Sequence, residues 1–164
     1  MSSENNNNQK SGGSNYGRFF LMLGLSFVAM YITMYLNTYE YDHVYFSLTR
    51  FYMTCLGIAA MAVIMLSLML KMYKSKKKNI AIYIGSLVLF VSALGLVRAQ
   101  RPIIGDVLYM KAMIPHHSIA ILTSKRADIK DPETKKLAEE IIEAQKREIA
   151  QMKKIIYRLE NENK

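Results

Sequence analysis

The stretch that decides the fold is residues 51–70, FYMTCLGIAAMAVIMLSLML, an apolar run of 20 residues without a charged side chain. A helix of about 20 apolar residues is long enough to cross a lipid bilayer. Two further uncharged runs occupy residues 19–36 and 80–97. The sequence therefore predicts three transmembrane helices within residues 19–97. The same segregation argues against a single soluble enzyme domain, which a chain of 164 residues would otherwise suggest.

The charges between the apolar runs predict their orientation. Residues 71–78 carry five lysines, whereas residues 37–50 carry the acidic side chains of Glu40 and Asp42. Cytoplasmic connections are enriched in Lys and Arg, so we expect the lysine-rich connection and the N-terminus in the cytoplasm. The expected location is a bacterial cytoplasmic (inner) membrane, crossed several times, with the lipid bilayer as a partner. The net charge of +9 reflects this topology, and no nucleic-acid partner is expected.

The segments outside the apolar runs differ in composition. Residues 1–18 are rich in Asn, Ser and Gly and bury little, which predicts a flexible cytoplasmic tail. We expect a connector at residues 98–104, a helical domain at residues 105–160 and a short tail at residues 161–164. The single cysteine, Cys55, lies in an apolar run, which excludes an intrachain disulfide and favours a packing role.

Residues 105–160 are expected to form two helices. Asp131 followed by Pro132 is a helix start, because the carboxylate accepts early backbone N–H groups and proline is favoured at the first position. We expect the first helix at residues 106–126, with a kink or a restart at Pro115. A short turn between two such helices predicts an antiparallel hairpin. Because a lone hairpin buries little apolar surface, we expect it to form a homo-oligomer or to rest on the membrane.

A cluster of methionine and histidine side chains lies in the first of these helices. The sequence MKAMIPHH contains Met110, Met113, His116 and His117, and Met152 is on the second helix. Residues three and four apart share a helix face, and thioether and imidazole ligands together favour Cu(I). Adjacent histidines point about 100° apart, so one of them is expected to face outward. The alternative is that the methionines fill the core of the hairpin.

Two sequence patterns resemble a known family. They are Met113-Ile114-Pro115-His116-His117 and, beginning at Gln145, the pattern that ends Glu148-Ile149-Ala150-Gln151-Met152. Together they are similar to the bacterial family known as domain of unknown function 305, over about residues 105–157. The resemblance implies a ferritin-like helical bundle, export or membrane anchoring, and copper binding through Met and His.

Carried over residue by residue, the resemblance implies Met113, His116, His117 and Met152 as copper ligands. Met110 is added by its spacing alone. The chain departs from the family at Ser118, where glutamine is common, and at Thr123, where many relatives have a methionine.

Polar side chains share the stripe of the second helix that carries Met152. We expect Gln145 and Glu148 to hydrogen-bond a histidine across the hairpin and so to set its tautomer. Alternatively, Gln145 pairs with its symmetry mate in a second copy. His43, in the first connection, is either an accessory ligand or a solvated loop side chain. No Glu-x-x-His pair, phosphate-binding loop or nucleophile elbow is present, so no enzymatic activity is expected.

The predicted fold is all-α, with three transmembrane helices followed by an extracytoplasmic antiparallel hairpin that represents half of a ferritin-like bundle. The predicted function is copper binding, as Cu(I), for sequestration or handover at the extracytoplasmic face. The alternative is a non-catalytic structural or interaction module of the cell envelope, in which the Met/His cluster is packing.

Overall fold

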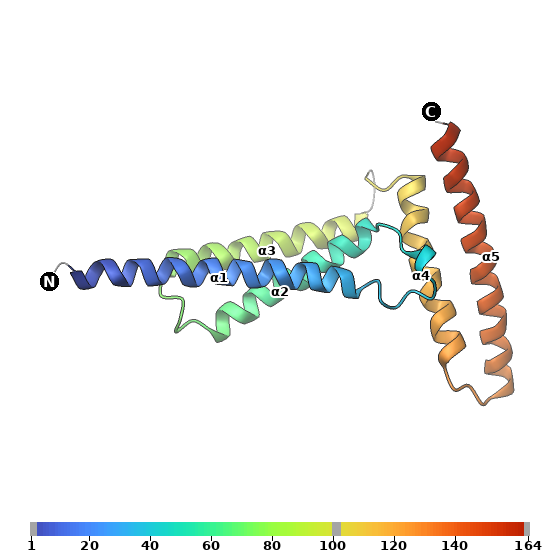
Figure 1. Ribbon diagram of the computed structural model, residues 1–164, viewed down its shortest axis with the longest axis horizontal. Coiled ribbons are helices and arrows are strands. Elements are labelled where there is room, and N and C mark those ends of the chain that lie inside the picture. The colour runs from blue at the N-terminus through green and yellow to red at the C-terminus, as the bar shows by residue number, and fades with distance from the viewer. Residues whose placement is uncertain (1–2, 100–102, 163–164) are drawn as a thin grey trace. The chain divides into compact units, whose positions relative to one another are not determined.

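The computed structural model describes the backbone of residues 3–99 and 103–162, and side chains from Asn15 onward. In these residues the chain forms α-helices and one 3-10 turn and contains no strand, which confirms the predicted all-α class (Figure 1). The chain divides into two compact units, each described by itself. The first contains residues up to 31 and residues 51–99, and the second contains residues 32–50 and those from 100 onward.

The first unit contains nearly all of the apolar helices α1 (Ser3–Thr33) and α2 (Leu48–Leu68) and the whole of α3 (Lys76–Ala99). Their segments Asn15–Thr33, Leu48–Leu68 and Lys76–Ala99 are long and apolar enough to cross a membrane. The three predicted apolar runs are therefore confirmed as helical; α2 and α3 begin and end within four residues of the predicted bounds, whereas α1 begins well before residue 19. Many of their large apolar side chains face outward, including Leu21, Leu68 and Leu87, which are 62%, 83% and 63% exposed.

The first half of α1 differs from the predicted flexible tail. Residues 3–17 are helical, although they are rich in Asn, Ser and Gly. They contain no proline, and each residue added to an existing helix contributes one backbone hydrogen bond, so the apolar half can propagate the helix toward the N-terminus. The first two residues of the expected tail lie outside the described part of the chain.

A cluster of polar side chains joins α1 to the start of α3. The hydroxyl of Tyr16 donates to Oδ1 of Asn79 at 2.6 Å, and it accepts the backbone N–H of Ser75 at 3.2 Å. The side-chain amide of Asn79 donates to the carbonyl of Tyr73 at 2.7 Å. The lysine-rich connection is therefore held against α1 by hydrogen bonds at its C-terminal end.

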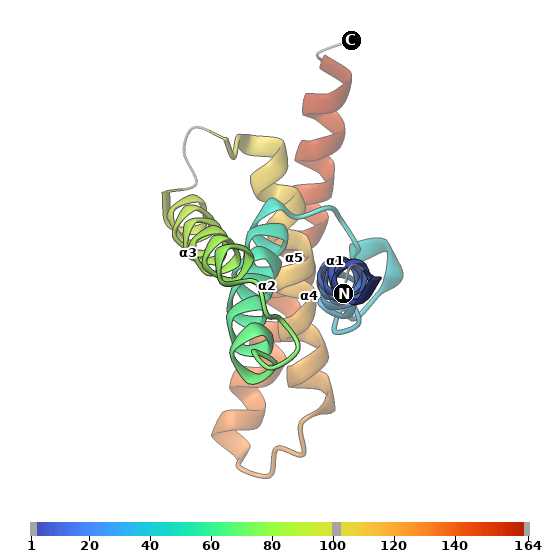
Figure 2. The ribbon, with the colours of Figure 1, turned by 90° about the vertical axis from the view of Figure 1, so that its left-hand side faces the viewer.

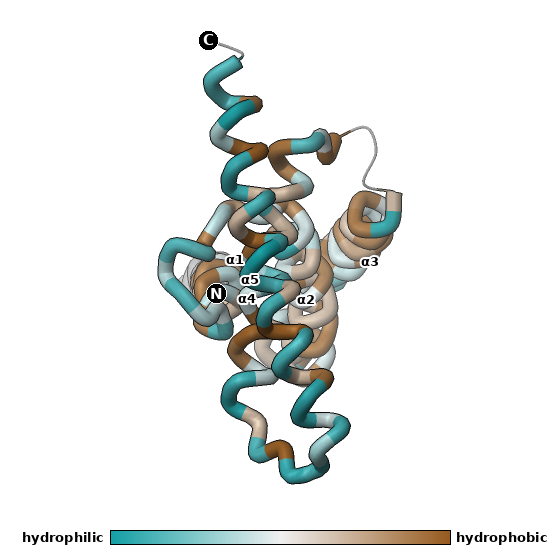
Figure 3. Tube along the Cα trace, turned by 90° about the vertical axis from the view of Figure 1, so that its right-hand side faces the viewer, coloured by the Kyte–Doolittle hydropathy of each residue, from teal (hydrophilic) through white to brown (hydrophobic). Residues whose placement is uncertain are grey.

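The second unit is built on α4 (Asp106–Arg126) and α5 (Pro132–Glu162), which lie antiparallel and side by side (Figures 1 and 2). Their core consists of Met110, Ile114, Ile121, Ile149 and Ile156. Figure 3 shows α5 largely hydrophilic with hydrophobic bands, as expected for a helix with one buried face. The antiparallel hairpin is thus present, and α5 ends two residues past residue 160, where the helical domain was predicted to end.

The predicted starts of both hairpin helices are confirmed. α4 begins at Asp106, and the N–H of Thr134 donates to Oδ2 of Asp131 at 2.7 Å, as expected for a capping residue. Pro115 lies inside α4, which continues as one helix and does not restart there. The proline ring is fully buried, so packing offsets the hydrogen bond that it removes.

The two short predicted segments are only partly described. Residues 98–99 of the expected connector belong to α3, and residues 100–102 fall in the gap of the described chain. Residues 161–162 of the expected C-terminal tail belong to α5, and the last two residues are not described.

The connection that follows α1 packs against the hairpin, which the sequence did not predict. It contains the 3-10 turn η1 (Tyr41–His43). The N–H of Tyr39 donates to Oγ of Ser118 at 2.7 Å, and Nδ1 of His43 lies 3.0 Å from the same atom. His43 is only 6% exposed and Ser118 is fully buried, so the interpretation of His43 as a solvated loop side chain is wrong.

Candidate metal centre

Most of the predicted site residues line an open pocket of about 480 Å³ between α4 and α5. Met110, Met113 and His117 enter it from α4, and Met152 enters it from α5. Four of the five predicted donors therefore line one pocket. The other lining residues are Asp106, Tyr109, Glu148, Gln151, Ile155, Arg158 and Leu159.

His117 is the polar centre of this pocket. Its Nδ1 lies 3.0 Å from Oε2 of Glu148, and its side chain is 16% exposed. Nδ1 is buried, yet it has no partner with acceptable hydrogen-bond geometry. The carboxylate therefore acts on the ring through its charge rather than through an aligned hydrogen bond. A proton on Nδ1 is favoured beside Glu148, which leaves the lone pair of Nε2 for a metal ion.

The electrostatic environment keeps the His117 imidazole neutral. Burial lowers the pKa of His117 below its usual value, Glu148 raises this pKa in opposition, and His116 lowers it further. Only a neutral imidazole can coordinate a metal ion. The pocket thus contains an imidazole in the protonation state that metal binding requires at neutral pH.

Of the two polar residues expected to support a histidine, only Glu148 contacts one. It lies beside His117 across the hairpin, but without the aligned hydrogen bond that the sequence predicted. Gln145 lies on the same helix and does not line the pocket. It is half-buried, and its predicted pairing with a second copy stays a prediction.

His116 is separated from the other predicted ligands. Its ring centroid lies 6.3 Å from that of His117, and its side chain is exposed. It lines a neighbouring pocket of about 300 Å³, and Met113 lines both pockets. The divergence of adjacent histidines agrees with their angular spacing on a helix. The five predicted donors therefore occupy two adjoining pockets, four of them from α4 and Met152 from α5.

Asp106 and Arg158 also line the main pocket, and sequence reasoning did not include them in the site. Asp106 could have been found from its spacing, because Asp106, Met110, Met113 and His117 follow one another at steps of four, three and four. Arg158 comes from the far end of α5, where only the pairing of the two helices brings it to this pocket.

The donor set fits a soft metal ion. Three thioethers and one neutral imidazole are ligands that favour Cu(I), whereas the carboxylates of Asp106 and Glu148 are harder donors. Met110 is only 7% exposed and also belongs to the core between the helices. The pocket thus contains soft donor atoms, and Met110 has a packing role in addition.

A second group of candidate ligands lies in the η1 connection. Nε2 of His43 is 3.5 Å from a carboxylate oxygen of Asp42 and 3.7 Å from one of Glu40. Asp42 also pairs with Lys153 of α5, and this hydrogen bond lowers the pKa of Asp42. Burial is the main cause that lowers the pKa of His43. The group joins the connection to both hairpin helices, which accounts for its charges without a metal ion.

The chain is thus all-helical in its described residues, with three apolar helices and a hairpin that carries a Met/His pocket. Residues 97–161 match the family model described as Domain of unknown function (DUF305). The chain is also 36% identical over 153 residues to an uncharacterized protein of Acanthamoeba polyphaga mimivirus, an alignment that covers 92% of this chain and 98% of that relative. No solved structure matches the chain.

The chain therefore belongs to the same family as this mimiviral protein, and its residues 97–161 match the DUF305 model. The alignment includes the apolar helices as well as the hairpin, because it covers nearly the whole chain. The relative is viral, so the expected bacterial membrane stays a prediction.

Proposed function

We propose that this chain is a membrane-anchored protein that binds copper as Cu(I) in the pocket between α4 and α5, for sequestration or handover. In this proposal α1, α2 and α3 cross the membrane, with the lysine-rich connection on the cytoplasmic side and the hairpin on the other side. The positive-inside rule supports this orientation. The proposed ligands are Met110, Met113, His117 and Met152, with His116 at the adjoining site.

One observation carries the proposal. Thioethers from two helices line the same open pocket as the His117 imidazole, whose pKa is lowered by burial and whose Nδ1 lies 3.0 Å from Glu148. With the proton on Nδ1 beside Glu148, Nε2 is the ring nitrogen available to a metal ion. Thioether and imidazole ligands would favour Cu(I), whereas Ca²⁺ and Mg²⁺ prefer oxygen ligands.

The second candidate function is a structural or interaction module in which the cluster is packing. It is favoured by the burial of Met110 in the core with Ile114 and Ile149. Leucine replaces methionine in a core with little change in packing but removes the sulfur atom. Met→Leu variants therefore separate the two functions.

The test is a competitive Cu(I) titration of the full chain in detergent, under reducing conditions, against a chromophoric chelator. We expect the wild-type chain to take Cu(I) from the chelator. Met113→Leu and His117→Gln are expected to weaken binding by roughly tenfold or more each, because each loses one ligand. The matched control is Met61→Leu, which changes a methionine packed in the other unit and should leave the affinity unchanged.

The outcomes decide between the two functions. Failure of the wild-type chain to compete, or equal affinity in Met113→Leu, His117→Gln and the control, would overturn the copper proposal and favour the packing module. Unchanged binding by Met110→Leu alone would remove Met110 from the ligand set. Circular dichroism of each variant verifies that helix content is retained.

A further inference from the structure

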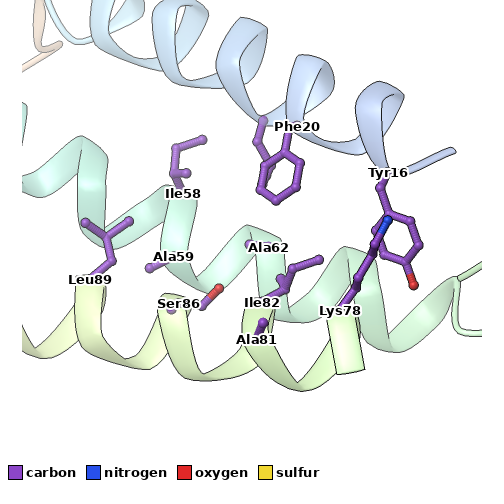
Figure 4. A pocket seen from close by; sticks show the side chains of 12 residues that line it. Tyr16, Phe20, Ile58, Ala59, Ala62, Lys78, Ala81, Ile82, Ser86 and Leu89 are labelled. Carbon is purple, nitrogen blue, oxygen red and sulfur yellow. The ribbon is translucent and has the colours of Figure 1, made fainter. Parts of the chain in front are cut away.

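The first unit contains an apolar groove that the copper proposal does not use. The groove has a volume of about 450 Å³ and is lined by side chains of α1, α2 and α3 (Figure 4). Small residues contribute to its lining, among them Ala59, Ala62 and Gly85. A Cβ atom added at Gly85 would meet no other atom within 4 Å, so this part of the groove is open. The volume lies within the range of roughly 300–1,000 Å³ that is typical of ligand pockets.

One end of the groove carries a positive charge. Figure 4 shows Tyr16 and Lys78 together at this end. The ammonium nitrogen of Lys78 lies 5.0 Å from the centroid of the Tyr16 ring, within the range of a cation–π contact. The Tyr16 hydroxyl is in turn hydrogen-bonded to Asn79. The ring that supports the ammonium group is therefore itself held in place.

No acidic side chain balances this charge within the described part of the first unit. Among the residues whose side chains are described, no carboxylate is paired with Lys78. The sequence has no Asp or Glu in residues 5–39 or 51–99, whereas residues 71–77 contribute four more lysines beside Lys78. This end of the groove is thus complementary to an anion supplied from outside the chain.

We propose that the groove binds an anionic phospholipid, with one acyl chain along the apolar lining and the headgroup phosphate at Lys78. The inference rests on the proposed membrane location of α1, α2 and α3. Clustered lysines next to membrane-spanning helices attract anionic lipids of the cytoplasmic leaflet, and basic pockets between such helices bind their headgroups. A transmembrane helix of another protein would cover the apolar lining but would leave the charge of Lys78 unmatched.

The test uses the full chain in detergent, titrated with phosphatidylglycerol or with phosphatidylcholine of identical acyl chains. Native mass spectrometry counts the bound lipids. We expect the wild-type chain to retain phosphatidylglycerol in clear preference to phosphatidylcholine. Lys78→Gln should weaken phosphatidylglycerol binding about fivefold. Lys71→Gln is the matched control, because it removes the same charge from the same connection without touching the groove.

A second pair of variants tests the apolar part. Gly85→Phe should fill the groove and reduce the binding of both lipids, because its side chain enters open space. Gly95→Phe is the control, since Gly95 lies on the same helix, has equally open surroundings and does not line the groove. Helix content measured by circular dichroism verifies that both variants are folded.

Three results would overturn the lipid site: equal retention of the two lipids, equal loss in Lys78→Gln and Lys71→Gln, or a bound polypeptide that Gly85→Phe displaces. Alkaline carbonate extraction of membranes tests the anchoring proposal by itself, so it shows whether the lipid site alone or the membrane anchoring has failed. Release of the wild-type chain by carbonate would overturn both. A chain that stays in the membrane fraction but shows no lipid preference would overturn the lipid site alone.

Discussion

Replacement of Ser118 by alanine tests how the η1 connection is attached to the hairpin. Oγ of Ser118 accepts the N–H of Tyr39 at 2.7 Å and lies 3.0 Å from Nδ1 of His43. Ser118→Ala removes the partner of both groups in a place where Ser118 is fully buried and His43 is 6% exposed. The variant changes one oxygen atom and leaves the apolar packing of α4 in place.

The expected cost follows from the burial of the two groups. A buried polar group that loses its partner costs about 1–3 kcal/mol, and Tyr39 is less buried than His43. We therefore expect the connection to lose about 2–4 kcal/mol of docking free energy. Because 1.4 kcal/mol is a factor of ten, its local opening should increase by roughly 30-fold or more.

Hydrogen exchange of backbone amides in the full chain measures this opening. We expect the amides of residues 39–44 to exchange roughly 30-fold faster in Ser118→Ala, while the amide of Ile149 in the hairpin core stays protected. Ser124→Ala, six residues further along α4, is the matched control. Exchange of residues 39–44 within about threefold of this control would refute the reasoning from the Ser118 hydrogen bonds.

Three further predictions concern stability in detergent. Ile114→Ala should lower the free energy of unfolding by about 2–5 kcal/mol, because Ile114 is completely buried, whereas Leu137→Ala, at a residue 55% exposed, should change it by no more than about 0.5 kcal/mol. Burial lowers the pKa of His43, so as the pH falls the unfolded chain takes up a proton at this histidine before the folded chain does. The stability that His43 contributes should therefore be complete above about pH 6.5 and be lost at lower pH. In His43→Gln the melting temperature should fall less steeply with decreasing pH than in the wild-type chain. Tyr16→Phe should cost about 1–3 kcal/mol in thermal melts, because Asn79 loses a buried partner.

Each of these predictions has a clear contrary result. Equal melting of Ile114→Ala and Leu137→Ala would mean that the hairpin core is not where the structure places it. The same pH dependence in wild-type and His43→Gln melts would assign the acid sensitivity to other groups. A Tyr16→Phe variant that melts at the same temperature as the wild-type chain would show that the hydroxyl of Tyr16 contributes no net stability.

Much of the fold could be predicted because the relevant signals are local. The uncharged run at residues 51–70 specifies an apolar helix by itself, and Asp131 before Pro132 specifies a helix start within one turn. The spacing of Met110, Met113 and His117 places them on one face of one helix. These inferences required no knowledge of which elements pack together.

The candidate site could be predicted only in part for the same reason. Local spacing correctly indicated that His116 and His117 diverge, but it could not choose between Gln145 and Glu148 as the contact of a histidine. That choice depends on the register of α5 against α4, which sets Glu148 at 3.0 Å from His117. Small changes of register would bring a different residue to the same position.

The sequence by itself determined the apolar helices, the hairpin and the residue types available for chemistry, because helix periodicity, capping and charge act over a few residues. Only the tertiary structure decided that the connection after α1 packs on α4, where Nδ1 of His43 contacts Oγ of Ser118, a residue 75 positions further along the chain. It also decided which methionines share a pocket with His117. Contacts of this kind depend on how whole elements pack, since a side chain carries no local mark of a distant partner.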